Sequence, residues 1–320
     1  MKKLLLLLAL AAVSVGLAAS ADAIRVGSYN IRLSPGDKGT PNAWPERKHD
    51  LVELVKKLDM DVFGMQEVCP DQAAYFRENL GEWEFVGDHR GPDRVSDEAS
   101  PVFYRKSRFE ALKKGTFWLS ETPEVPASKS WKTACTRVCS YLILKDRRTG
   151  RKFCFANTHT DHRSALAREK GMLLIIERMK EFGEGAPIVF TGDHNCREND
   201  KPAVAVAQIL KNALYLSETP PVGSWRTFSG WQWRDEEVPV AEALKYPVDV
   251  RNARSGSPDG EKVDGRYPFE RLGPRIDYIY VSPGVRVLSY ATVNAPRPGK
   301  KLYPSDHFPI TATIDLGPAK

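Results

Sequence analysis

The 320-residue sequence has few cysteines, and they form no recognisable motif. The odd number, five, lies at Cys69, Cys135, Cys139, Cys154 and Cys196. Their spacing matches neither a disulfide framework nor a Cys/His zinc site. We therefore expect structural cysteines, although an oxidising compartment would permit a disulfide. The sequence also has no internal repeat, low-complexity tract or flexible linker, so nothing divides residues 24–320 into more than one domain.

Two catalytic motifs and a block of basic charge are also missing. There is no serine in a nucleophile-elbow turn and no glycine-rich phosphate loop, which disfavours acyl transfer and nucleoside triphosphate cycling. The 47 Lys and Arg residues only slightly outnumber the 41 Asp and Glu residues, and they are dispersed along the chain. This balance permits an anionic substrate without requiring nucleic acid.

A strongly apolar run occurs only at the N-terminus. Met1 and two lysines precede a leucine-rich stretch that changes into small residues ending in Ala-Ser-Ala and Ala-Asp-Ala. This layout predicts a signal peptide over residues 1–23, cleaved near Ala21 or Ala23. A membrane anchor is the alternative, but the run is shorter than the roughly 20 residues that span a bilayer. We expect an exported protein, periplasmic or extracellular, without stable membrane insertion.

Hydrophobic periodicity predicts many strands with a few helices between them. Helical spacing of apolar residues occurs over 46–60 and 165–182, and residues 201–212 are also expected to be helical. Strand-like runs occur at both ends of the chain and between the helices. Residues 88–98 and 217–272 are polar or rich in Trp and Pro, so we expect surface loops there. The pattern is typical of a mixed α and β domain.

Polar residues stand where several of the predicted strands stop. These strand-end residues are Asn30, Glu67, Asn157, His159, Asp193, Asn195, Asp277, Asp306 and His307. One such residue means little, because strands commonly end in Asp or Asn turns. If the strands lie side by side, however, the whole group converges on one rim of a sheet.

These residue types indicate a chemistry. Carboxylate and amide oxygens suit a hard cation such as Mg²⁺ or Mn²⁺. Two histidines with carboxylate partners suit proton transfer and charge stabilisation on a phosphoryl group. The pattern therefore favours metal-assisted attack of water on a phosphate ester.

The ordered motifs SYNIR, MQEV, NTHTDH, TGDHN, RIDYI and SDHFP resemble the endonuclease/exonuclease/phosphatase family over about residues 24–315. GTFWLSETP and SWKTACTR are similar to an exported bacterial branch of it. The resemblance implies a deoxyribonuclease-like α+β fold. Such a fold is a four-layer α/β/β/α sandwich of two mostly antiparallel mixed sheets flanked by helices.

The resemblance also implies roles for individual residues. The metal, Mg²⁺ or Mn²⁺, would be held on the side formed by Glu67, Asn30 and Asp306. The implied catalytic residues are His159, Asp193, Asn195, Asp277 and His307. Of these, Asp193 would orient or deprotonate the attacking water, and Asp277 would orient a protonated His307 toward the phosphate.

Two departures from the family pattern involve His194 and Glu98. His194 replaces an apolar residue in TGDHN, and we expect it to pack against a neighbouring strand or point to solvent. A glycine that often precedes the acidic residue is missing before Glu98, so no role is assigned to it.

Substrate contacts are less well defined by the sequence. Asn157, Arg163 and Arg168 are candidate substrate-binding residues, because helix N-termini and arginines both suit phosphate. A capped and solvated first helical turn is the competing interpretation for the two arginines. Basic residues between 106 and 152 and scattered tryptophans would suit nucleic acid, but solvated turns and packing explain them equally well.

Three hypotheses remain open. The first is a phosphodiesterase or nuclease, and the second is a phosphatase or phosphodiesterase of a small molecule or lipid headgroup such as an inositol phosphate or sphingomyelin. The third is a non-catalytic binding module, which the complete set of polar strand-end residues disfavours. We expect a monomer whose partner is a phosphate-ester substrate, with nucleic acid as one candidate.

Overall fold

The computed structural model describes residues 22–254 and 268–317. The first of two mixed sheets has seven strands, in the order β10 (Val222–Gly223), β12 (Arg286–Thr292), β13 (Ile310–Asp315), β1 (Ile24–Asn30), β2 (Val62–Gln66), β4 (Val102–Arg105) and β3 (Trp83–Val86). Its parallel pairs are β1 with β2 and β10 with β12. The other neighbours are antiparallel.

The second sheet has six strands, in the order β5 (Phe109–Trp118), β6 (Val138–Asp146), β7 (Lys152–His159), β8 (Ile188–Asp193), β11 (Asp277–Val281) and β9 (Lys211–Asn212). Only β7 and β8 run parallel. The remaining pairs are antiparallel.

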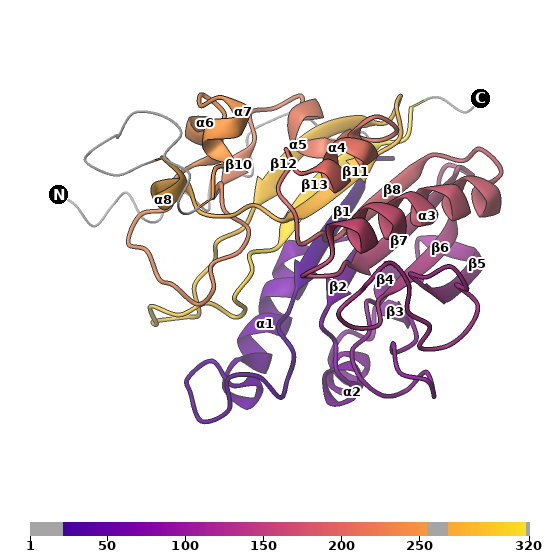
Figure 1. Cartoon of the computed structure of the whole chain (residues 1–320), viewed down its shortest axis with the longest axis horizontal. Helices are drawn as coiled ribbons and strands as arrows, with labels where there is room; N and C mark the ends of the chain where they lie inside the picture. The colour runs from indigo at the N-terminus through magenta and orange to yellow at the C-terminus, as the bar shows by residue number, and fades with distance from the viewer. Residues whose placement is uncertain (1–21, 255–267, 318–320) are drawn as a thin grey trace.

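Four main helices cover the outer faces of the sheets (Figure 1). They are α1 (Trp44–Leu58), α2 (Pro70–Asn79), α3 (Ala165–Gly183) and α4 (Lys201–Ala207). Short helices α5 (Ala213–Leu216), α6 (Val240–Ala243), α7 (Val248–Arg251) and α8 (Pro268–Leu272) occur later in the chain. The start of α3 is capped by the Ser164 side chain, which accepts a hydrogen bond from the Ala167 amide.

Three buried clusters define the layers. One lies between the sheets and includes Val26 and Val62 of the first sheet and Phe155 and Val189 of the second. Another joins the second sheet to α3 and α4, and a third joins the first sheet to α1 and α2. The result is the predicted four-layer α+β sandwich, because each sheet buries one face against the other sheet and one face against helices.

Two local predictions differ from the structure. The helix expected over 201–212 ends at Ala207, and Lys211–Asn212 instead forms β9 beside β11. Residues 217–272 are not only surface loops: Trp225 and Val240 are fully buried in the cluster between the sheets.

The predicted signal peptide lies almost entirely outside the described residues, so its cleavage stays a prediction. Within the ranges 22–254 and 268–317, no helix is long and apolar enough to cross a membrane.

Candidate active site

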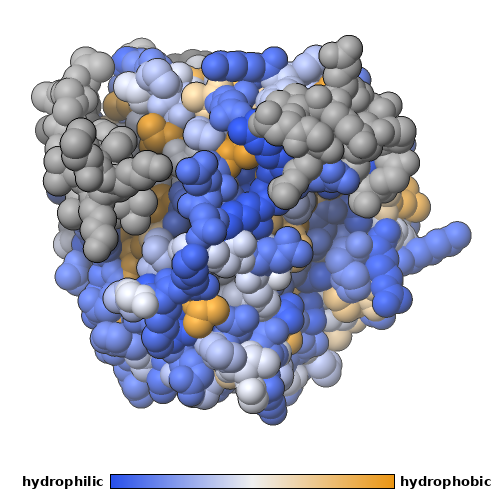
Figure 2. All heavy atoms as spheres, turned by 90° about the vertical axis from the view of Figure 1, so that its left-hand side faces the viewer, coloured by the Kyte–Doolittle hydropathy of each residue, from blue (hydrophilic) through white to orange (hydrophobic). Residues whose placement is uncertain are grey.

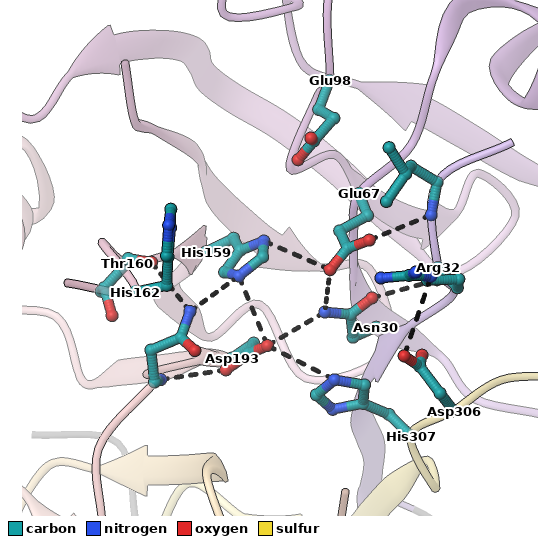
Figure 3. Close-up of polar contacts among 12 residues, drawn as sticks. Asn30, Arg32, Glu67, Glu98, His159, Thr160, His162, Asp193, Asp306 and His307 are labelled. Carbon is teal, nitrogen blue, oxygen red and sulfur yellow. Dashed lines mark hydrogen bonds and ion pairs between the residues drawn. The ribbon is translucent and has the colours of Figure 1, made fainter. Parts of the chain in front are cut away.

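Strand pairing brings the polar strand ends to one rim. Asn30 ends β1 beside Gln66 of β2, and Glu67 follows directly. In the second sheet, His159 at the end of β7 pairs with Asp193 at the end of β8. Asp277 begins β11 opposite Asp193. Parallel strands that end at the same level therefore gather groups from both sheets, as the strand-end argument predicts (Figure 3).

Asn30 links the two sheets within this site. Its Nδ2 donates to Glu67 Oε1 and to Asp193 Oδ2, both at 3.0 Å. Its Oδ1 accepts from the Arg32 amide at 3.0 Å. In this arrangement Asn30 therefore positions two carboxylates with its amide nitrogen, while its oxygen is occupied by the backbone.

Glu67 adopts a strained backbone conformation. Its φ is +63°, in the left-handed region that non-glycine residues rarely occupy. Its Oε2 accepts from the Leu33 amide at 3.0 Å. The Glu67 carboxylate therefore lies at the rim, where Asn30 donates to one of its oxygens and the Leu33 amide donates to the other.

His159 is buried between three polar groups. Its Nε2 lies 2.9 Å from Asn195 Nδ2 and 3.4 Å from Asp193 Oδ2. Its Nδ1 lies 4.0 Å from Glu67 Oε1 and has no hydrogen-bond partner in the described part of the chain. Burial, together with nearby arginine charges, lowers the pKa of His159 well below its usual range, so the ring is neutral.

His307 has the opposite protonation state. Its Nδ1 lies 2.9 Å from Asp277 Oδ2, and its Nε2 lies 3.6 Å from Asp193 Oδ2. Burial alone would lower the pKa of His307, but the charges of Asp277 and Asp193 outweigh it and raise the pKa to about 10. Burial and Asp277 in turn raise the pKa of Asp193. The site thus combines a protonated imidazole with a carboxylate of increased proton affinity.

Asp306 lies at the other side of Glu67 and Asn30 (Figure 3). Ser305 Oγ donates to Asp306 Oδ1 at 3.3 Å, and Arg32 Nε lies 3.9 Å from Asp306 Oδ2. Burial raises the pKa of Asp306. The charge of Glu67 adds to the effect of burial, and a bound cation would favour the ionised form of Asp306.

The donor set fits a divalent cation. Ligand atoms of Glu67, His159 and Asp193 lie within 4.8 Å of one another, as do those of Asp193, Asp277 and His307. Because Asp277 is committed to His307, the open carboxylates are those of Glu67, Asp193 and Asp306. Hard oxygen donors of this kind suit Mg²⁺ or Mn²⁺, which keep several of their waters.

Asn157 does not reach the rim, contrary to its assignment as a substrate contact. Its side chain is fully buried, accepts from Gln66 Nε2 at 2.6 Å and donates to the Met65 carbonyl at 2.7 Å. Strand alternation places it on the same face as His159 but two residues deeper. Asn157 is therefore a polar clamp between the sheets.

The two candidate arginines behave differently from each other. Arg168 is buried, and its Nη1 donates to the Asp161 carbonyl at 2.8 Å, so it supports the loop after β7 rather than an exposed binding surface. Arg163 is exposed just before α3. No contact places it against the site, and its substrate role stays a prediction.

Three charged residues near the site are not identified by the strand-end argument. Arg32 follows β1, Glu98 lies in the loop after β3, and Arg137 directly precedes β6. Glu98 forms an ion pair with Arg90 at 2.8 Å. Burial and the negative charge of Glu67 raise the pKa of Glu98, and they outweigh the opposite effect of Arg90. Figure 3 shows Glu98 beside Glu67. Loop residues carry no periodicity, so sequence alone offers little signal for them.

His194 packs away from the chemistry. It is fully buried, with its ring 4.8 Å from Phe190 and stacked 5.6 Å from Tyr280. Neither ring nitrogen has a hydrogen-bond partner within the described residues. The packing alternative of the sequence analysis is correct for this residue.

Comparison with solved structures supports the same fold. A mannosyl-6-phosphatase from Bacteroides thetaiotaomicron superposes with a TM-score of 0.75 at 29% identity, covering 91% of this chain and 99% of that one. An endonuclease/exonuclease/phosphatase from Bacteroides vulgatus gives a TM-score of 0.74 at 30% identity, with coverage of 92% and 99%.

More distant relatives are longer proteins. Nocturnin from Drosophila melanogaster is 23% identical over 86% of this chain, and human tyrosyl-DNA phosphodiesterase 2 is 20% identical over 50% of it. The chain spans less than half the length of these two relatives, 42% and 40% respectively. Residues 27–307 match the Endonuclease/Exonuclease/phosphatase family. Together with the shared fold, this match shows that the chain belongs to that family.

Proposed function

We propose that this chain is an exported, divalent-metal-dependent phosphoesterase that hydrolyses a phosphate ester by attack of an activated water. The observation that carries the proposal is the buried contact set at the rim. A neutral His159, a protonated His307 and the carboxylates of Asp193 and Glu67 lie within a few ångströms of each other. The matched family and the mannosyl-6-phosphatase neighbour support the same chemistry.

The proposed role of each residue follows from its charge. Asp193 has the proton affinity needed to take a proton from water, and Asn195 and His159 would bind phosphate oxygens beside it. The His307 imidazolium, held by Asp277, would stabilise the negative charge that develops on the phosphoryl group. Glu67 and Asp306 would hold the cation, and Asn30 would position the Glu67 carboxylate. The cation supplies further charge neutralisation when bound.

The surroundings of the rim favour a small polar substrate over a polymer. The aromatic ring of Phe228 lies 4.8 Å from His307, and the Ser229 amide donates to the Asp306 carbonyl at 2.7 Å. Glu98 lies beside Glu67 (Figure 3). We propose that these two loops limit access to the site, as expected for an enzyme that acts on a small molecule.

The basic side chains considered for nucleic-acid binding do not extend the site. They are Lys106, Arg108, Lys113, Lys114, Arg147, Arg148, Arg151 and Lys152. Lys152 begins the eight-residue strand β7 and His159 ends it, so seven residue steps, or about 23 Å, separate them. Several of these cations are also paired, including Arg108 with Asp146 and Lys114 with Glu84. This charge would not guide a nucleic-acid strand into the site.

The described part of the face in Figure 2 is mostly hydrophilic, and its apolar residues form small separate patches. The described part of this face therefore offers no broad apolar patch to a membrane surface. A phosphodiesterase or nuclease activity remains the second candidate, supported by the family match.

The test is hydrolysis by purified protein with Mg²⁺ or Mn²⁺ and with EDTA. The panel comprises sugar phosphates, nitrophenyl phosphate, bis-nitrophenyl phosphate, inositol phosphates, sphingomyelin, RNA and plasmid DNA. We expect metal-dependent release of phosphate from the small monoesters. Preferential cleavage of DNA or RNA would instead support the second candidate, and EDTA-resistant activity would contradict the role assigned to Glu67.

A further inference from the structure

Arg137 is a buried cation with little compensation from the protein. Only 5% of its surface is exposed. Its one side-chain hydrogen bond within the described ranges joins Nη2 to His162 Nδ1 at 3.2 Å. Its Nε is buried without a hydrogen-bond partner. The charge of Arg137 acts on the Glu98 carboxylate and lowers its pKa, but the two side chains form no ion pair within 4.0 Å. Burying a cation in this way is costly unless another group compensates it.

Other buried arginines in the chain are better satisfied. Arg108 pairs with Asp61 and Asp146, and Arg226 pairs with Glu237. Arg168 and Arg275 also have an unpartnered Nε, but each donates to a backbone carbonyl. The Arg137 guanidinium donates to no backbone carbonyl among the residues that the structure describes, so its charge is available to a ligand.

The position of Arg137 is next to the catalytic centre. The β6–β7 register pairs Cys139 with Thr158, which places Arg137 across from the chain just beyond His159. The charge of Arg137 is also one cause of the low pKa of His159. In Figure 3, His162 lies on the opposite side of His159 from Asp306. The Arg137–His162 pair therefore flanks the site away from the predicted metal side.

The pair presents hydrogen-bond donors. Partial desolvation of the largely exposed His162 ring, together with the charge of Arg137, lowers the pKa of His162. The ring is therefore neutral, and its Nδ1 can accept a hydrogen bond from Arg137 Nη2. The remaining nitrogen, Nε2, then carries the hydrogen. A ligand would meet this N–H together with the guanidinium, and such an arrangement selects an oxyanion.

A cation is the competing ligand, because Cys135, Asp161 and His162 place ligand atoms within 4.8 Å of one another. However, the Asp161 carboxylate already accepts from the Ala134, Arg163 and Ser164 amides and from a threonine hydroxyl. Two guanidiniums also adjoin the group, with Arg90 Nη1 3.8 Å from Cys135 Sγ. These charges favour an anion.

We propose that Arg137 and His162 form a subsite for a second phosphate group of the substrate, beside the phosphate that is hydrolysed. This inference rests on the proposed phosphoesterase function and narrows its substrate class to bisphosphorylated small molecules.

The experiment compares glucose 1,6-bisphosphate with glucose 6-phosphate for the wild type and Arg137→Met. Because Arg137 would make a charged hydrogen bond to the second phosphate, the wild type should prefer the bisphosphate by about tenfold or more in kcat/KM. In Arg137→Met this preference should fall to about one, because the bisphosphate loses more kcat/KM than the monophosphate does. Arg178→Met, which removes a positive charge from α3, controls for net charge and should keep the preference.

Binding provides a readout that does not depend on turnover. Calorimetry in EDTA should show tighter binding of the bisphosphate than of the monophosphate to wild type, and Arg137→Met should abolish the difference. If Arg137→Met does not fold, Arg137→Lys is used, which should keep the charge but lose most of the preference.

Equal losses with both substrates would overturn the subsite, because they would show that Arg137 only positions His159. Equal binding of the two ligands to wild type would also overturn it. If wild type binds the bisphosphate preferentially but hydrolyses no ester in the panel, the subsite stands and the proposed catalytic function fails.

Discussion

At the scale of single residues, the protonation states in the site depend on which buried side chains have a charged partner. His159 and His307 both lie beside Asp193, yet only His307 has a dedicated carboxylate, Asp277. The two imidazoles consequently hold different protonation states in one pocket. This difference gives each of them a separate task on the phosphate.

Glu67→Gln should lower kcat/KM by about a hundredfold or more, because it removes a charge from the predicted cation site. His307→Ala should have a similar effect through loss of transition-state stabilisation. Steady-state assays check both, with circular dichroism to confirm that the variants fold. Near-normal turnover in a folded variant would contradict the site.

The protonation states predict how activity depends on pH. Asp193 must lose its proton to act as a base, and its raised pKa predicts that kcat/KM rises with pH on the acid side. His307 must keep its proton, and its pKa of about 10 predicts a decline only at strongly alkaline pH. Asp277→Asn should move that decline to lower pH. A pH profile of kcat/KM that is unchanged by Asp277→Asn would refute this assignment.

His194 predicts a stability effect at acid pH. Burial lowers the pKa of His194 to about 3. Below about pH 6.5 the His194 side chain is therefore protonated in the unfolded chain but stays neutral in the folded protein. The cost grows as pH falls from about 6.5 to about 3 and reaches about 2 kcal/mol at pH 5. His194→Phe should flatten this part of the stability curve.

Urea unfolding at pH 7 and pH 5 measures the effect. Substitution of the exposed His49 by Gln is the control, because it removes a histidine from the surface rather than from the core. A curve for His194→Phe with the wild-type slope would show that His194 is not buried in its neutral form.

At the scale of elements, the strands could be predicted better than the segments between them. The rim residues stand out because an apolar run stops at each one, and pairing of those strands brings Asn30, Glu67, His159 and Asp193 together as expected. Asn157 follows the same pattern but lies one strand repeat too deep. Arg137, like the other charged loop residues near the rim, belongs to a segment without a repeating pattern, so only the folded chain shows its place.

The packing of β2 against β7 provides a prediction at this scale. A Cβ added to Gly64 would lie 2.1 Å from the Asn157 side chain. Gly64→Ala should therefore destabilise the protein by about 1–3 kcal/mol, because the two sheets must separate or the clamp must move. Gly81→Ala, where the space is open, is the matched control. Similar unfolding midpoints for the two variants would argue against the clamp.

At the scale of the whole molecule, the N-terminal segment is tied to the body by one buried arginine. Arg108 Nη2 donates to the Asp22 carbonyl at 2.9 Å, and its Nη1 donates to the Ala23 carbonyl at 2.8 Å. Of the two predicted cleavage positions, the one after Ala21 would preserve both contacts.

We therefore predict that cleavage of the proposed signal peptide leaves Asp22 as the first residue. Intact-mass measurement of protein recovered from the periplasm or medium would test this. A mass that corresponds to a start at Ile24 would contradict the role of Arg108, and retention of residues 1–21 would contradict the proposed signal peptide.

The pairing of the first strand with the last has a consequence for how the molecule is made. β1 lies between β2 and β13, with Ile24 opposite Ile314. A nascent chain cannot complete its first sheet until β13, at Ile310–Asp315, has been synthesised, since one edge of β1 stays open until then. The segment before β13 should therefore stay incompletely folded while it is translated, which is the state that the proposed export through a channel for unfolded polypeptides would require.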